Sequence, residues 1–197
     1  MKRMLFFTFI LLMSASCNTQ NKTAENPFFS AWETPYGVPP FDKIRPEHFM
    51  PAFERAMSLH DAEIDAIVSN HDEPTFENVI AAYDRSGRML EQVGLVFGML
   101  CEAESSEQLR ALQEQAMPLL TAHDDKIGMN ERLFAKVKAV YDRRAEFGLG
   151  ADETRLLEET YRAFVRSGAL LGEEEKARLK AINEDLALVS VKFSANL

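Results

Sequence analysis

The stretch "NPFFSAWETPYGVPPFDKIRPEHFMPAFERAM", residues 26–57, contains the change of backbone pattern that decides the fold. Its first part is rich in proline and aromatic residues and has no helical spacing. Because proline fixes φ and lacks a backbone donor, such a segment is held extended and loses little entropy on ordering. After Pro46, apolar residues recur at steps of three and four, which predicts an amphipathic helix. We therefore expect an extended arm over residues 26–45 that wraps the helices and is clamped onto them by Phe28, Phe29, Trp32, Tyr36 and Phe41.

The rest of the chain has the periodicity of helices, and no segment shows convincing strand alternation. Ser105 followed by Gln108 resembles a capping box, and Gly148 follows one of the apolar runs. The sequence predicts an all-α array of about six mostly antiparallel helices in one domain over residues 46–197. The expected helices cover residues 46–69, 75–100, 105–127, 131–147, 152–166 and 173–197.

Residues 1–17, "MKRMLFFTFILLMSASC", have the organisation of an export signal. Basic residues precede an apolar run that is shorter than the roughly 20 residues of a membrane-spanning helix. Small residues directly before Cys17 favour the lipoprotein type of signal, in which Cys17 is lipidated; ordinary cleavage near Ala15 is the alternative. Residues 18–25 would then be a polar tether. The sequence thus predicts an exported, periplasmic protein that is anchored to a membrane through a lipid on Cys17.

The chain is acidic, with a formal net charge of −9, and 46% of its residues are hydrophobic. Since phosphates are bound by Lys and Arg, this charge argues against a nucleic-acid partner and against docking on anionic lipid through a basic face. The hydrophobic content is sufficient for a real core in a single domain. Cys101 is the only cysteine besides Cys17, and its apolar neighbours predict a buried, unreactive side chain.

The four histidines do not form a catalytic or metal-binding motif. No two of them are four residues apart, so the H-E-x-x-H zinc helix is absent. We expect His48 to cap a helix or face solvent, and His71 to lie in a solvated loop. His60 and His123 fall on apolar helix faces, where a hydrogen-bonded core histidine is the common explanation. The two aspartates after His123 diverge from it on a helix, so we assign no catalytic and no metal-binding residue.

Two further motifs have simple explanations. No G-x-S-x-G nucleophile turn and no glycine-rich phosphate loop occurs in the sequence. Gly94 and Gly98 have the G-x-x-x-G spacing of close helix contacts, which predicts tight packing in an amphipathic helix.

Several long segments nevertheless resemble one known family. They are "TPYGVPPFDKIRPEHFMPAFERAM" (34–57), "PTFENVIAAYDRSGRMLEQVGLVFGML" (74–100), "NERLFAKVKAVYDRR" (130–144), "LGADETRLLEETYRAFVRSGALL" (149–171) and "KARLKAINEDLALVSVKFSANL" (176–197). In this order they are similar to the N-terminal region of the peptidyl-dipeptidase Dcp and oligopeptidase A branch of the thimet oligopeptidase family of zinc metallopeptidases. The peptidyl-dipeptidase branch is the closer match.

The resemblance implies a part of a larger, two-lobed helical peptidase whose helices form one wall of a deep channel. It implies zinc in the full-length family, with ligands that have no matching position in this chain, and short unstructured peptides as substrates. We therefore expect the chain to be inactive by itself and to expose an apolar patch where further protein packs. The alternative is a stand-alone, lipid-anchored helical module that binds peptides or a partner protein without catalysis.

Overall fold

The computed structural model describes residues 26–103 and 106–194. The expected signal, Cys17 and the tether lie outside the described residues. The described residues contain helices and turns and no strand, so the predicted all-α fold is confirmed. The α-helices are α1 (Phe49–Ser69), α2 (Ala82–Asp84), α3 (Arg88–Ala103), α4 (Glu107–Gly128), α5 (Glu131–Asp142), α6 (Ala151–Arg166) and α7 (Glu173–Ser194).

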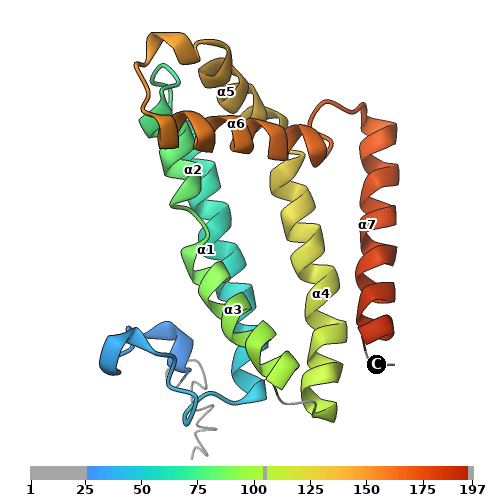
Figure 1. Ribbon diagram of the computed structural model, residues 1–197. Coiled ribbons are helices and arrows are strands. Elements are labelled where there is room, and N and C mark those ends of the chain that lie inside the picture. The colour runs from blue at the N-terminus through green and yellow to red at the C-terminus, as the bar shows by residue number, and fades with distance from the viewer. Residues whose placement is uncertain (1–25, 104–105, 195–197) are drawn as a thin grey trace, which may run out of the picture.

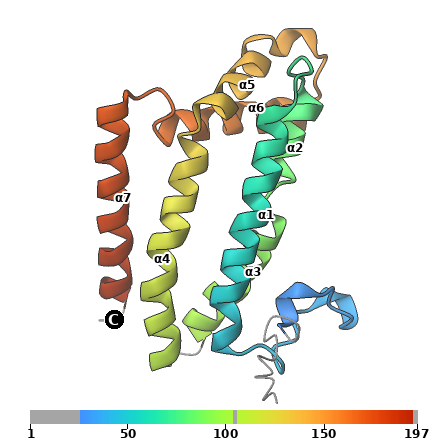
Figure 2. The same ribbon diagram turned by 180° about the vertical axis from the view of Figure 1, so that it is seen from behind.

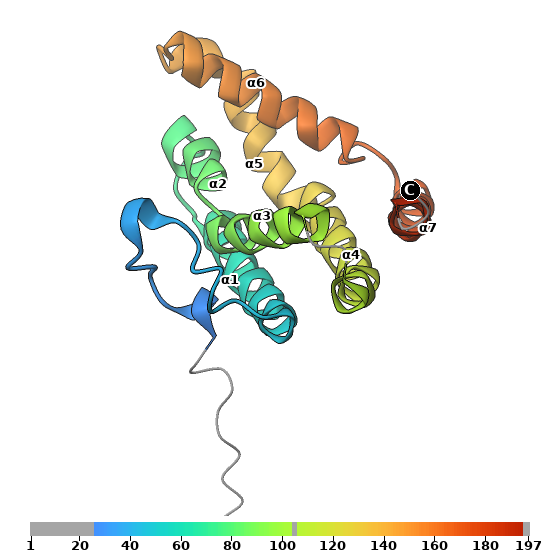
Figure 3. The ribbon, with the colours of Figure 1, turned by 60° about the horizontal axis from the view of Figure 1, so that its bottom comes forward.

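Four of the helices stand side by side. Helices α1, α3, α4 and α7 alternate in chain direction, and α5 and α6 lie across the upper ends of α1 and α4 (Figures 1 and 2). Helix α3 packs along α1, whereas α7 packs along α4 at the edge of the array (Figure 3). The antiparallel expectation therefore holds for the upright helices, while the α5–α6 pair is a crossing layer.

The predicted helix over residues 75–100 is divided in the structure. Thr75 and Asn78 exchange hydrogen bonds in a reciprocal cap (3.2 and 2.8 Å), which starts a π-helix, Phe76–Ala81, that continues into α2. The chain then bends at residues 85–87 before α3 begins. Gly87 has φ +71°, a conformation that glycine adopts without the steric cost a Cβ would add. The prediction of one continuous helix was wrong at this bend.

The other helix ends differ from the predicted ones by small shifts. Ser106 caps α4 by accepting from the backbone N–H of Leu109 at 3.2 Å, while Ser105 lies outside the described residues. Helix α5 ends at Asp142 instead of residue 147, and a 3₁₀ turn, Arg144–Glu146, follows it. Asn130 accepts from the N–H of Leu133 at 3.0 Å and starts α5. Local capping thus explains where each of these helices begins.

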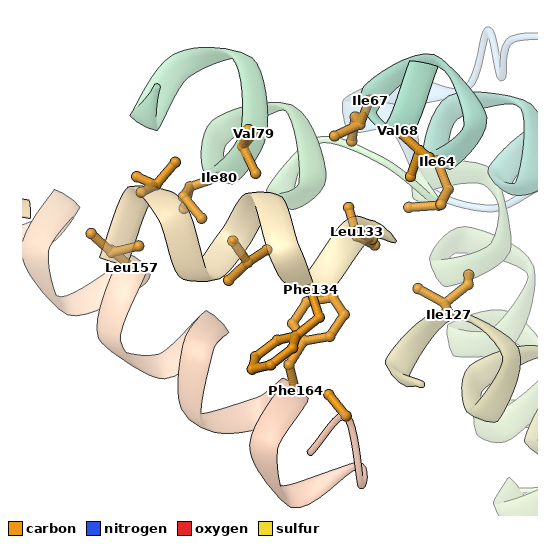
Figure 4. Close-up of a cluster of buried hydrophobic side chains, with 13 residues drawn as sticks. Ile64, Ile67, Val68, Val79, Ile80, Ile127, Leu133, Phe134, Leu157 and Phe164 are labelled. Carbon is orange, nitrogen blue, oxygen red and sulfur yellow. The ribbon is translucent and has the colours of Figure 1, made fainter. Parts of the chain in front are cut away.

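Two separate apolar cores hold the array together. The arm core surrounds the first half of α1 and includes Phe28, Phe49, Phe53, Val93 and Phe97. The distal core surrounds the second half of α1 and includes Ile64, Ile80, Leu133, Phe134 and Phe164. Phe49, Phe53 and Phe97 dominate the arm core, with ring centroids 5.0 Å (Phe49–Phe97) and 5.4 Å (Phe53–Phe97) apart. In the distal core, Phe134 of α5 lies against Phe164 of α6 (Figure 4), with their ring centroids 6.1 Å apart. Each such aromatic pair adds about 0.5–1.5 kcal/mol beyond its buried area.

Most of the predicted aromatic clamp is present in the arm. Phe28 is buried against Phe49 (centroids 5.3 Å apart), and the Trp32 indole donates to the carbonyl of Pro27 at 2.9 Å. Phe29 lies under the guanidinium of Arg55, 4.5 Å from the ring centroid. By contrast, Tyr36 points into solvent from a tight turn at φ +60°, so the clamp predicted for it was wrong. Phe41 is 41% exposed and lines a hollow with Phe49 and Leu100. The arm is therefore attached by its first few aromatic residues.

Candidate functional site

The histidines expected to have local roles have them. His48 accepts a hydrogen bond from the backbone N–H of Arg45 at its Nδ1 (3.0 Å), which fixes the turn before α1. His71 is exposed in the loop after α1. Both outcomes confirm the expectations of a capping side chain and a solvated loop residue.

His123 is buried and His60 is half-buried, and both are hydrogen-bonded as expected, but they bond to each other. His60 on α1 and His123 on α4 approach to 3.1 Å between His60 Nδ1 and His123 Nε2, with ring centroids 5.2 Å apart. The other nitrogen of His60, Nε2, lies 3.2 Å from Ser86 Oγ. Ser86 Oγ in turn donates to the carbonyl of Tyr83 at 2.7 Å. We call this row of three side chains, Ser86, His60 and His123, the histidine chain.

Acidic and basic groups surround the histidine chain without joining it. Asp61 Oδ1 lies 3.8 Å from His123 Nδ1. The same oxygen forms an ion pair with Lys126 Nζ at 2.8 Å. Glu63 accepts the backbone N–H of Gly87 at 2.7 Å. Asp125 turns away from His123 and accepts from the Asn183 amide on α7 at 2.7 Å, which confirms that these neighbours diverge. The pKa of Asp124 is raised, mainly because burial disfavours its carboxylate.

The chemistry available to this cluster is limited to holding protons and hydrogen bonds. Within residues 26–103 and 106–194, no group of three or more His, Cys, Asp or Glu side chains is arranged to hold a metal ion. The described residues therefore do not fit a zinc site. Ser86 Oγ donates to a backbone carbonyl and not to His60, so it is not arranged as an activated nucleophile.

The second feature of note is an exposed apolar row on α7. Ile182, Leu186, Val189 and Phe193 follow one another at steps of four, three and four, and each is 51–64% exposed. These steps place them on one face of the helix, a pattern typical of a seam between helices. We call these four residues the α7 stripe. Helix α7 lies beside α4 at the edge of the array (Figure 3). Asn183 and Val191 line the groove between these two helices, whereas the stripe residues are exposed.

An open groove of about 320 Å³ runs between α4 and α7. Met117 and Thr121 line one wall, and Leu186, Ala187 and Val191 line the other. Leu186 thus belongs both to the groove and to the α7 stripe, so the apolar surface continues from the groove onto the outer face of α7. None of the described helices is long and apolar enough to cross a bilayer.

A related exposed face occurs on α3, and it corrects a prediction. A Cβ built at Gly94 or Gly98 would meet no atom within 4 Å, so these glycines do not pack closely and the expected tight contact is absent. Leu95 and Met99 beside them are exposed. Cys101, on the same helix, is half-buried, and burial raises the pKa of its thiol, as suits a side chain that packs against the arm core.

Sequence reasoning missed the histidine chain because its members are far apart along the chain. His60 and His123 are separated by 63 positions, and the spacing within each helix shows only that each faces inward. The α7 stripe could have been found, since its steps of four, three and four are visible in the sequence. What periodicity does not reveal is which of two apolar faces on a helix is covered.

Comparison with known proteins gives one consistent group of relatives. The chain is 38% identical over 175 residues to "Dipeptidyl carboxypeptidase" of Escherichia coli (strain K12), which covers 89% of this chain and 26% of the relative. It is 36% identical over 172 residues to the protein of the same name in Salmonella typhimurium (87% and 25%). It is 26% identical over 164 residues to "Oligopeptidase A" of Escherichia coli (83% and 24%). No protein-family model matches the chain.

The matches cover 83–89% of this chain, whereas the chain spans about a quarter of the length of these curated relatives. The identity is higher to the dipeptidyl carboxypeptidases than to oligopeptidase A, as the quoted segments predict. The resemblance is therefore confirmed: this chain is a peptidase-related N-terminal region of the dipeptidyl carboxypeptidase and oligopeptidase A type.

Proposed function

We propose that the chain is the non-catalytic helical portion of a zinc peptidase that removes dipeptides from the C-termini of short peptides. The observation that carries this proposal is the 36–38% identity to two dipeptidyl carboxypeptidases over 87–89% of the chain. Zinc would supply activation of water in the whole protein. The described residues do not fit that ion, so their role is to build the wall of the peptide channel.

The exposed apolar surfaces support a role as one part of a larger assembly. A row of four large apolar side chains on α7 is a surface that a partner helix covers readily, since helices pair through apolar residues at this spacing. The helical channel wall would exclude folded proteins, and short unstructured peptides would therefore be the substrates.

The proposal is tested on the entire gene product that contains this chain. The purified protein is incubated with a short peptide, and released fragments are identified by mass spectrometry with and without a zinc chelator. Release of C-terminal dipeptides that stops with the chelator is expected. The 197-residue chain alone should release none. If the entire gene product binds the peptide but cleaves nothing, the peptidase assignment is wrong and the non-catalytic binding module is favoured.

We also propose that the protein is exported to the periplasm and held at a membrane by a lipid on Cys17. The support is the sequence before Cys17, which combines a basic start, a short apolar run and small residues. Cells that express the protein are labelled with radioactive palmitate. Label should enter the wild type and be lost in Cys17→Ser. Equal labelling of both proteins, or none in either, would contradict lipidation and favour cleavage near Ala15.

A further inference from the structure

The histidine chain lies at the level where three elements pass from one core to the other. On α1, His60 falls between Phe53 of the arm core and Ile64 of the distal core. On α4, His123 falls between Ala116 of the arm core and Ile127 of the distal core.

The third element, the bend between α2 and α3, is arranged in the same way. Tyr83, before Ser86, packs on the distal core, and Met89, after it, packs on the arm core. The two cores are thus separated by a polar layer that consists of the histidine chain.

The direction of the hydrogen bonds along the histidine chain determines which ring nitrogen carries the proton when His60 and His123 are neutral. Ser86 Oγ donates to the Tyr83 carbonyl, so its lone pairs accept from His60 Nε2–H. His60 Nδ1 is then unprotonated and accepts from His123 Nε2–H. Every donor is used once in this arrangement, and only His123 Nδ1, which faces Asp61 at 3.8 Å, remains open to a proton.

The histidine chain can therefore take up one proton without losing the His60–His123 hydrogen bond, but not two. A first proton on His123 Nδ1 faces the carboxylate of Asp61 and leaves the His60–His123 bond intact. A second proton must go to His60 Nδ1, where it meets His123 Nε2–H across 3.1 Å. Two donors and two positive rings then face each other at the buried His123 and the half-buried His60, which is unfavourable.

The charges around His60 set the direction of its pKa. Burial and the neighbouring His123 lower the pKa of His60 below its ordinary 6.5, while Glu63 and Asp61 act in the opposite direction. The other charged groups at this level are Asp124 and Lys126 on α4. Because the pKa is lowered in the folded state, the stabilisation is complete above pH 6.5 and is lost as pH falls through the lowered pKa.

We propose that Ser86, His60 and His123 form a pH-sensitive joint that couples the arm core to the distal core when neutral and uncouples them when doubly protonated. Each core is closed by apolar contacts that do not titrate, so acid loosens the connection while each core remains packed. One extra proton bound by the open form makes the opening equilibrium up to about tenfold more favourable per pH unit between pH 6.5 and the lowered pKa of His60.

Natural probes report the two cores separately. Trp32, the single tryptophan, packs on the arm core, whereas Tyr83, Tyr141 and Tyr161 pack on the distal core. Denaturant unfolding of the purified 197-residue chain is followed by tryptophan fluorescence and by the tyrosine signal in near-ultraviolet circular dichroism. The two midpoints should coincide at pH 7.5 and separate at pH 5.0, because coincidence of probes indicates a single cooperative unit.

A matched pair of variants assigns the effect to the joint. His60→Gln keeps one donor and one acceptor but does not titrate, so its two midpoints should remain together at pH 5.0. His71→Gln removes an exposed histidine outside the joint and should behave as the wild type does. Coincident midpoints in the wild type at both pH values, or separated midpoints in His60→Gln at pH 5.0, would overturn the proposal.

A measurement on the unmodified protein keeps the proposal testable if His60→Gln does not fold. Long-range proton–nitrogen correlation spectra of the imidazoles should show His60 neutral at pH 7.5, with its proton on Nε2. On acidification, His60 should become charged only below its ordinary pKa of 6.5. A charged His60 at pH 7.5, or a neutral His60 with its proton on Nδ1, would overturn the joint.

Discussion

Gly87 offers a direct test of how firmly the His60 ring is held. A Cβ at this position would lie 3.0–3.1 Å from three atoms of the His60 ring, closer than carbon and ring atoms normally approach. The ring is fixed on both sides by Ser86 and His123, so it cannot simply swing away. Gly87 also has φ +71°, which non-glycine residues adopt at a cost.

The expected loss for Gly87→Ala has two parts. The left-handed backbone costs about 1–2 kcal/mol for alanine. The steric overlap with the ring adds about 1–3 kcal/mol, as is typical when a methyl group is forced into a packed site. We therefore expect the free energy of unfolding to fall by about 2–5 kcal/mol, a large share of a domain's stability.

Gly148 provides the matched control. It has φ +61°, and a Cβ there would meet nothing within 4 Å, so Gly148→Ala should show the backbone part alone. Unfolding in urea at pH 7.5 gives both values. In a His60→Ala background, the effect of Gly87→Ala should shrink to that of Gly148→Ala, since the overlap is gone. Equal losses for the two glycine variants in the wild-type background would refute a fixed ring.

Three other substitutions probe the remaining features, each by urea unfolding at pH 7.5. Gly98→Ala should raise the free energy of unfolding by about 1 kcal/mol, because the position is an open helix interior; a loss would show a hidden close contact. Asn183→Leu should lower it by about 1–3 kcal/mol by leaving the buried Asp125 carboxylate without its partner; no change would show that the α4–α7 bond is unimportant. Phe28→Ala should cost about 3 kcal/mol, and Tyr36→Ala, its exposed control, close to nothing; similar effects would contradict the arm attachment.

The sequence is most informative where local physics decides the structure. Apolar spacing places most helices to within a few residues, because this signal acts within one or two turns. The bend at Gly87 escapes this reasoning, since a single glycine inside an apolar periodicity is tolerated in many helices. The left-handed backbone at φ +71° and the packing of His60 against that position together explain why glycine is required there.

Tertiary choices are less visible in the sequence. The arm's aromatic residues looked equivalent, yet Phe28 is buried and Tyr36 is exposed, because the chain turns at Tyr36 and carries its side chain away from the helices. The G-x-x-x-G spacing of Gly94 and Gly98 is likewise ambiguous. It gives helices a surface that permits close approach, but whether a neighbour uses that surface depends on the rest of the assembly.

The open faces of α3 and α7 are best understood together. Glycine in a helix costs about 1 kcal/mol relative to alanine, and the described residues show no contact at Gly94 or Gly98 that offsets this cost. The α7 stripe keeps large apolar side chains in water, where they contribute nothing to the stability of the described array. Both features gain a physical reason if further helices cover these faces, as the proposed peptidase requires. The hydrogen-bond partners of Ser86 and His60, by contrast, all lie within the described residues, so the proposed response to acid can be measured on this chain.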